Sequence, residues 1–264
     1  MADSPNLFER IKRHFEQQTG VAAAPGPSTV DAFVQEIRRK QTLIQALDDF
    51  IRNIYVADGL RTQDAQRSVA ESLVELTYYG QHSSNGLLIT DDGYFFTALH
   101  CIENDGHHPL DQARVRLYDG TIYPVEKVCA RLKSEDLAIV KAAIPTPCRA
   151  RQYRFYNTNV LDNDAVVLLS RWNGTLVAKD GSITHANYVI TVRNTNHPDI
   201  VYYNHFLTDH ASIHGDSGGT ITTPDGRVAG LVSGGNYMIT SGVKLIRLLD
   251  LLHGYKRHIQ RSLE

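Results

Sequence analysis

Residues 214–219 read His-Gly-Asp-Ser-Gly-Gly, and this stretch of the chain is the most informative about its fold. Glycines on both sides of Ser217 allow a tight turn, so the N–H groups of Gly215 and Ser217 can converge on one point. Such a donor pair stabilises the oxyanion that forms when a hydroxyl attacks a carbonyl. Gly, Asp and Ser are also common in surface turns, so the motif alone leaves a simple turn as the alternative.

Two segments upstream supply the other groups that a hydroxyl nucleophile needs. His100 lies in Thr-Ala-Leu-His-Cys (97–101) at the end of an apolar stretch. Asp136 begins the otherwise apolar stretch Asp-Leu-Ala-Ile-Val (136–140). A histidine can accept the hydroxyl proton, and a carboxylate can hold that histidine in the right tautomer. Each motif alone also has a plainer interpretation, as a surface histidine or a turn-ending aspartate.

Taken in the order His, Asp, Ser, the three motifs resemble those of the trypsin-like (chymotrypsin-fold) serine proteases. Within that group, residues 69–235 are most similar to the HtrA/Deg-type protease domain, and we expect no PDZ domain after it. The resemblance implies a mainly β fold of two six-stranded β-barrels. It also implies a serine endopeptidase in which Ser217 is the nucleophile, His100 the general base and then acid, and Asp136 the residue that orients His100. The same likeness implies that Gly215 and Ser217 form the oxyanion hole.

The resemblance further predicts where a protein or peptide substrate binds. Ser233, in the stretch Gly-Leu-Val-Ser-Gly-Gly, would line the substrate strand and support Asp136. Gly234 and Gly235 would form the wall of the primary specificity pocket. A substrate strand would pair with the backbone there, as an added β-strand does.

The base of that pocket is expected six residues before the nucleophile, at Ala211. Because no carboxylate stands there, the sequence predicts small to medium apolar residues at the P1 position of the substrate. His210 and His214 flank the loop. If either side chain points into the pocket, an acidic P1 residue becomes the alternative, whereas a basic one is excluded in both cases.

Two residues depart from the patterns of these families. HtrA-type enzymes typically have Asn where Asp216 stands, and the secreted, zymogen-activated proteases pair this Asp with a new N-terminal ammonium. The sequence has no basic residue followed by Ile/Val-Val-Gly-Gly, the site at which cleavage would create such an N-terminus. Asp216 is therefore expected to find another partner or to remain solvated. The cysteine after the histidine, Cys101, lacks its usual partner in the preceding strand and is expected to be a free thiol.

The segments around the motifs indicate a protease domain at 65–264 and a helical N-terminal extension at 1–64. The expected elements of the extension are a first helix, a linker over 20–28 and a longer amphipathic helix. The resulting alternatives for the extension are a structural brace and a regulatory or recruitment module. The apolar stripe of the longer helix consists of Val30, Phe33, Val34, Ile37, Ile44, Leu47, Ile51 and Ile54.

Hairpin signals and a second helix complete the outline of residues 65–264. Asp-Gly pairs flanked by apolar runs at 92–93, 119–120 and 225–226 predict hairpins. Residues 243–260 have the pattern of an amphipathic helix near the C-terminus. Short strands separated by turns are typical of Greek-key barrels or sandwiches.

The amino-acid composition bears on nucleic-acid binding, membrane insertion, cellular location and cofactors. With 27 Lys and Arg against 29 Asp and Glu, the formal charge is −2, which gives no electrostatic case for nucleic acid. No apolar run approaches the length of a membrane span. Three cysteines and no secretory signal indicate a reducing, cytoplasmic location, with an exported protein whose signal has been removed as the alternative. Cys101, His107 and His108 match no zinc spacing, so we expect no metal and no organic cofactor.

A second function remains open from the sequence alone. The chain could be a catalytically weak pseudoprotease that acts as a peptide-binding or adaptor module. The complete set of His, Asp and Ser residues argues against it. Through its N-terminal helices, the protein could also bind a protein partner or a second copy of itself.

Overall fold

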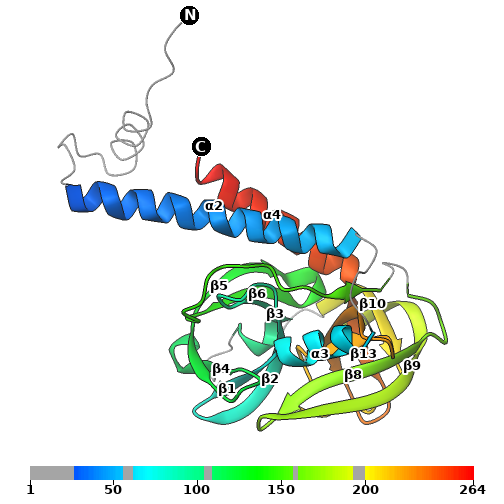
Figure 1. The fold of residues 1–264 in the computed structure, drawn as a ribbon. Coiled ribbons are helices and arrows are strands. Elements are labelled where there is room, and N and C mark those ends of the chain that lie inside the picture. Colours follow the sequence, from blue (N-terminus) through cyan, green and yellow to red (C-terminus); the bar gives the residue numbers. More distant parts are fainter. Residues whose placement is uncertain (1–26, 56–61, 104–108, 157–159, 193–199) are drawn as a thin grey trace, which may run out of the picture.

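The computed structural model describes residues 27–55, 62–103, 109–156, 160–192 and 200–264. Strands form most of its regular structure, as the sequence predicts, and they build two adjoining sheets against which helices pack (Figure 1). The sequence predictions for a first helix, most of the 20–28 linker and residues His107 and His108 lie outside the described residues. In the described ranges, no helix has the length and apolar character that crossing a membrane requires.

The first sheet is a closed six-stranded barrel in the order β1-β2-β3-β6-β5-β4. All its neighbouring strands are antiparallel. Alternating apolar side chains such as Val74, Leu76 and Val140 fill the interior of this barrel. The strands are β1 (Leu73–Tyr78), β2 (Gln81–Leu88), β3 (Tyr94–Ala98), β4 (Ala113–Arg116), β5 (Ile122–Leu132) and β6 (Leu137–Ala142).

The second sheet has seven strands in the order β11-β8-β9-β10-β13-β12-β7. Because β11 also pairs with β12, six of these strands form a second ring, to which the short β7 adds in parallel. The strands are β7 (Arg154–Phe155), β8 (Ala165–Trp172), β9 (Thr175–Val192), β10 (Ile200–Thr208), β11 (Thr220–Thr222), β12 (Arg227–Gly235) and β13 (Thr240–Lys244).

The three predicted Asp-Gly hairpins are present. They connect β2 to β3, β4 to β5 and β11 to β12. Gly93, Gly120 and Gly226 all have positive φ angles, between 81° and 102°, which is the conformation that hairpin turns demand and glycine adopts without strain.

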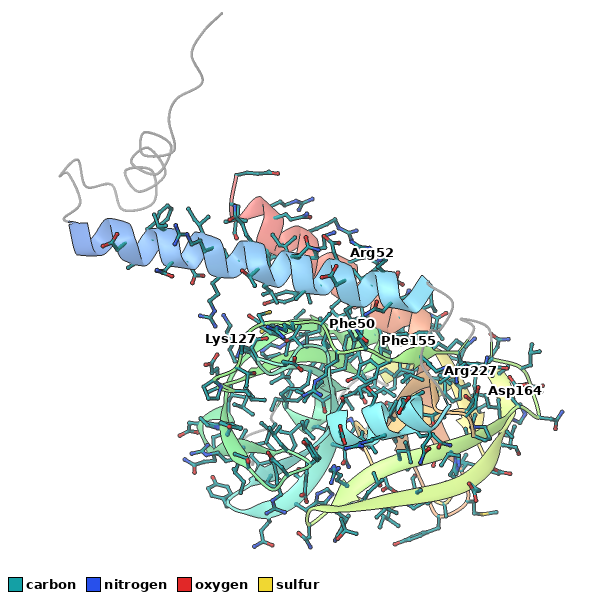
Figure 2. The ribbon with its side chains drawn as sticks, in the orientation of Figure 1. Phe50, Arg52, Lys127, Phe155, Asp164 and Arg227 are labelled. Carbon is teal, nitrogen blue, oxygen red and sulfur yellow. The ribbon has the colours of Figure 1, made fainter. Side chains whose placement is uncertain are left out.

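Two helices close the molecule on one side. Helix α2 (Pro27–Tyr55) lies across the barrels beside α4 (Leu245–Arg261), and its N-terminal half extends past them (Figure 1). Phe50 of α2 is 1% exposed and packs edge-on against Tyr153 and Phe155, between the helix and the sheets (Figure 2). The same apolar cluster includes strand residues of both barrels, so α2 and α4 share one core with them.

The two halves of the apolar stripe predicted in α2 are buried to different extents. Leu47 and Ile51 are buried, whereas Phe33, Val34 and Ile37 are only half-buried. The C-terminal half of the helix therefore acts as a brace. A further helix, α3 (Thr62–Ser72), spans the predicted domain boundary at residues 64 and 65 and leads directly into β1, so that boundary stays a prediction.

Candidate active site

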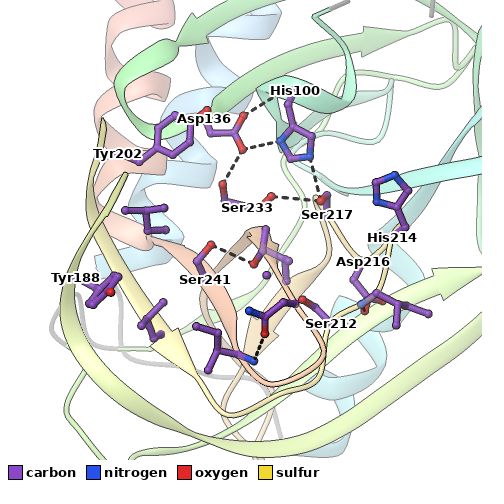
Figure 3. Close-up of a pocket in the computed structure, with 18 of the residues that line it drawn as sticks. His100, Asp136, Tyr188, Tyr202, Ser212, His214, Asp216, Ser217, Ser233 and Ser241 are labelled. Atoms are coloured by element: carbon purple, nitrogen blue, oxygen red, sulfur yellow. Dashed lines mark hydrogen bonds and ion pairs between the residues drawn. The ribbon is translucent and has the colours of Figure 1, made fainter. Parts of the chain in front are cut away.

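The structure brings His100, Asp136 and Ser217 together in the cleft between the barrels (Figure 3). His100 Nδ1 lies 2.7 Å from Asp136 Oδ2, and His100 Nε2 lies 3.1 Å from Ser217 Oγ. The backbone N–H of His100 also donates to Asp136 Oδ1 over 2.9 Å. His100 and Asp136 come from the first barrel and Ser217 from the second, so the site exists only when both barrels are in place.

Asp136 is nearly inaccessible to solvent, with 3% of its surface exposed. It has a left-handed backbone conformation (φ 55°) at the end of a short 3-10 turn, directly before β6. Ser233 donates its hydroxyl hydrogen to Asp136 Oδ2 over 2.6 Å, which agrees with the supporting contact predicted for it. These bonds fix the carboxylate and the orientation of the imidazole.

The electrostatics of His100 follow from this environment. Burial disfavours the imidazolium, but the neighbouring Cys101 sulfur and the Asp136 carboxylate outweigh burial and raise the pKa of His100 above its ordinary value. Cys101 Sγ lies 3.5 Å from His100 Nε2. Cys101, Cys129 and Cys148 are all free thiols.

The loop before Ser217 is held by the first barrel. Asn85 of β2 donates from Nδ2 to the Gly215 carbonyl over 2.7 Å, and its backbone N–H donates to the Ser217 carbonyl over 2.7 Å. These bonds turn the Gly215 carbonyl toward the first barrel. Gly215 has a φ of 102°, and a Cβ there would lie 2.4 Å from His82 Nε2, so only glycine fits.

A buried Glu–His pair supports the same carbonyl. His82 Nδ1 is 2.7 Å from Glu75 Oε1, and His82 Nε2 is 3.2 Å from the Gly215 carbonyl oxygen. Burial alone would raise the pKa of the fully buried Glu75. Hydrogen bonds from His82 and from the N–H groups of Asn173 and Gly174 outweigh burial and lower it. Glu75 and His82 thus connect the first barrel to the loop of the nucleophile.

A pocket of about 830 Å³ opens beside Ser217. Ser233, Gly234, Gly235 and His214 border it, as the sequence predicts. Residues that the sequence did not point to contribute most of the remaining wall, and they come from β9, β10, β13 and the loop before it, and positions next to the predicted motifs. They are Tyr188, Ile190, Thr191, Tyr202, Leu207, Ser212, Ile213, Val232, Asn236, Tyr237, Ile239 and Ser241.

The prediction of Ala211 as the base of the pocket is wrong. Ala211 is exposed and does not line the cavity, whereas the next residue, Ser212, does. The N–H of Ser212 donates to the Asn236 carbonyl over 3.0 Å, which holds Ser212 against the pocket wall and turns Ala211 away. His210 is buried outside the pocket, with its Nδ1 2.9 Å from Thr208 Oγ1.

Asp216 has found a partner within the second barrel. Lys179 Nζ of β9 lies 2.6 Å from Asp216 Oδ2. No motif pointed to Lys179, because the two residues are 37 positions apart in the sequence. In the described part of the chain, no cluster of three or more His, Cys, Asp or Glu side chains is arranged to hold a metal ion.

Comparisons with solved structures agree with this architecture. A protease from Mycobacterium tuberculosis H37Rv, Rv3671c, matches in its active form with a TM-score of 0.57 and 17% identity over 71% of this chain and 82% of that chain. An inactive serine-to-alanine mutant of Rv3671c matches with a TM-score of 0.54 and 17% identity over 76% and 95%. The MamO protease domain of Magnetospirillum magneticum matches with a TM-score of 0.56 and 17% identity over 69% and 96%. At this identity, the likeness establishes the fold.

The sequence itself carries the family assignment. No curated protein matches the chain at a significant level. The family model for the trypsin-like peptidase domain, however, matches residues 84–231, which is more than half of the chain and includes all three motifs. The resemblance seen in the sequence is thereby confirmed, and the chain belongs to the trypsin-like peptidase family, as a serine protease.

Proposed function

We propose that the protein hydrolyses peptide bonds through an acyl-enzyme on Ser217, with His100 as general base and Asp136 as the residue that orients it. The observation that carries this proposal is the unbroken series of contacts from Asp136 Oδ2 through both nitrogens of His100 to Ser217 Oγ, at 2.7 and 3.1 Å. Nucleophilic catalysis by a weakly acidic hydroxyl depends on such an adjacent, oriented base.

In this mechanism, His100 Nε2 accepts the hydroxyl proton as Ser217 Oγ forms a bond to the carbonyl carbon. The N–H groups of Gly215 and Ser217 stabilise the negative oxygen of the tetrahedral intermediate. His100 then gives the proton to the departing amine as the C–N bond breaks. Water releases the acyl group in the reverse sense, with His100 again as the base.

The pocket supports the predicted preference for small to medium apolar P1 residues and, because His214 borders it, keeps an acidic P1 residue as the alternative. Its wall combines the aliphatic Leu207 and Val232 with hydroxyl groups, and its two carboxylates, Asp136 and Asp216, are both engaged in hydrogen bonds. No carboxylate among the described lining residues is therefore free to pair with a basic side chain. Cleavage of a peptide library mainly after Lys or Arg would contradict this preference.

Variants of the three residues test the proposed catalysis. Ser217→Ala or His100→Ala should lower kcat by about 10⁶-fold, and Asp136→Asn by about 10⁴-fold, as equivalent changes do in other serine proteases. Circular dichroism and thermal unfolding should show that the variants stay folded. Undiminished peptide cleavage by purified Ser217→Ala protein would refute the assignment.

A fluorophosphonate probe separates this proposal from the alternative of a pseudoprotease that only binds peptides. The probe reacts with activated serines, so covalent labelling of Ser217 in the wild type, absent in Ser217→Ala, supports an enzyme. Peptide binding without labelling would support the pseudoprotease instead.

We also propose that the N-terminal helices contribute regulation or recruitment, and that the protein works in a reducing compartment such as the cytoplasm. The half-buried apolar side chains in the projecting part of α2 support the first idea, and the three free thiols support the second. Truncation before Lys40 should spare the fold and change activity or assembly, measured by peptide cleavage and light scattering. Unchanged activity and mass would leave the helix only its bracing role. Recovery of the native protein in the extracellular fraction would exclude the proposed location.

A further inference from the structure

We propose that Lys179 is a positioning residue that holds residues 211–216 in their active arrangement. It would take the place of the N-terminal ammonium that partners this aspartate in zymogen-activated proteases. The inference rests on the proposed function, because it assigns a role to Lys179 in forming the oxyanion hole beside Ser217.

The contacts of Asp216 carry the argument. Asp216 is 2% exposed, and its carboxylate accepts three hydrogen bonds. Lys179 Nζ donates to Oδ2 over 2.6 Å, the Ile213 N–H donates to Oδ2 over 2.9 Å, and Ser170 Oγ donates to Oδ1 over 2.8 Å. A carboxylate so far from water is costly unless an opposite charge compensates it, and Lys179 is the cation bonded to it.

Lys179 also connects the two ends of the loop. Its ammonium donates to the Ala211 carbonyl over 3.1 Å as well as to Asp216. One charge therefore fixes the first and the last residues of 211–216. The Gly215 N–H, one of the two proposed oxyanion donors, belongs to the His214–Gly215 peptide, which lies inside the segment whose two ends Lys179 holds, so its direction depends on those bonds.

The position of Lys179 within the folded second barrel bears on how the enzyme becomes active. Lys179 and Ser170 lie on β9 and β8, which are hydrogen-bonded neighbours in the second barrel. The charge that anchors Asp216 is thus part of the folded barrel and is available without cleavage of the chain. We infer that the enzyme is active as a single chain, with no need for a newly formed N-terminus at Asp216.

The rate of fluorophosphonate labelling of Ser217 tests this role, because the probe's phosphoryl oxygen occupies the oxyanion hole. Lys179→Met should lower the second-order rate about 100-fold, as loss of an oxyanion donor does. Lys179→Arg keeps the charge and should stay within about tenfold of wild type, since guanidinium can bond the same carboxylate. In Lys179→Met, the additional change Asp216→Asn should cause little further loss, because the pair acts as a unit.

Lys256→Met is the matched control. Lys256 forms a partly buried pair with Asp48 that connects α4 to α2, far from the loop. This variant should label at the wild-type rate and lose less thermal stability than Lys179→Met, because Asp48 is more exposed than Asp216. The comparison shows whether losing a lysine–aspartate pair outside the loop affects labelling.

The labelling results distinguish a failure of the role proposed for Lys179 from a failure of the proposed function. Folded Lys179→Met protein that labels at the wild-type rate overturns the role of Lys179. If Lys179→Met fails to fold, Asp216→Asn takes its place, and wild-type labelling of that variant has the same meaning. If wild-type protein with intact Lys179 is not labelled, the proposed function fails instead, independently of Lys179.

Discussion

Gly218, directly after the nucleophile, has a φ of 76°, and a methyl group in place of its hydrogen would lie 1.9 Å from the Asn85 carbonyl oxygen. Backbone strain and the clash act together at this position. We expect Gly218→Ala to lower the free energy of unfolding by about 2–4 kcal/mol. It should also lower kcat/KM at least 100-fold, because Asn85 holds the Ser217 carbonyl and the Gly215 carbonyl.

Gly120 provides the control for Gly218, since its φ of 86° is similar but nothing lies within 4 Å of an added Cβ. Gly120→Ala should cost only about 1 kcal/mol and leave activity intact. Urea unfolding and peptide cleavage measure both variants. Equal effects of the two substitutions would show that the contact with Asn85 has no importance.

His205 gives a prediction for the pH dependence of stability. It is fully buried and stacks on Tyr202, and burial lowers its pKa to about 4. The unfolded chain binds a proton at this residue near pH 6.5, whereas the folded chain does so only near pH 4. Stability contributed by His205 is therefore present above pH 6.5 and falls by up to about 3 kcal/mol as the pH drops to 4.

His205→Phe should flatten this part of the stability curve, since a phenyl ring keeps the stacking contact and takes up no proton. The measurement is the urea midpoint between pH 4 and pH 7. The exposed His185 gives the control, because His185→Phe should leave the pH dependence as in the wild type. If the pH dependence of stability persists in His205→Phe protein, it arises from other titrating groups.

At the scale of elements, the brace formed by α2 is tested at Phe50. The ring contacts Phe96, Tyr153 and Phe155 at centroid distances of 6.3, 5.8 and 5.6 Å. Truncation leaves a cavity between the helix and both barrels, so Phe50→Ala should cost about 3–5 kcal/mol. The half-buried Val34, in the projecting part of the same helix, should cost less than 1 kcal/mol when changed to Ala. A loss below 1 kcal/mol at Phe50 would contradict the bracing role.

Local signals determined how far the sequence could predict these elements. The three Asp-Gly hairpins, the C-terminal helix and the motifs around His100, Asp136 and Ser217 are each encoded within a few consecutive residues. Asn85 and Lys179 are different, because they act on residues 130 and 37 positions away. No local pattern distinguishes such a lysine from any surface lysine. Ala211 shows the same limit, since one backbone bond at the next residue decides which side chain faces the pocket.

At the scale of the whole molecule, Arg171 connects the second barrel to the start of the first. Its guanidinium donates to the carbonyls of Leu73, Ala70 and Gly174 at 3.1, 2.8 and 3.0 Å. Burial lowers the pKa of Arg171, which is only 7% exposed. The guanidinium can remain buried because its N–H groups are hydrogen-bonded to these carbonyls. Arg171→Met leaves buried acceptors without donors and should cost about 2–4 kcal/mol.

Activity should fall together with stability in Arg171→Met protein, because the proposed catalytic residues come from both barrels. Peptide cleavage and thermal unfolding measure the two effects. The exposed Arg67 pairs with Glu71 on the same helix, so Arg67→Met should change neither by a measurable amount. Wild-type activity in Arg171→Met protein would show that the barrels keep their alignment without this contact.

The position of α4 after every strand has a consequence for the timing of activity during synthesis. Leu248, Leu249 and Leu252 of this helix complete the core that both barrels share. A chain still attached to the ribosome, with this helix inside the exit tunnel, therefore lacks the last wall of that core even though all three motifs have been translated. Nascent chains stalled just before Leu245 should not react with a fluorophosphonate, and release of the full chain should restore labelling. We therefore expect the protease to stay inert toward its own ribosome and neighbouring nascent chains until α4 has left the exit tunnel.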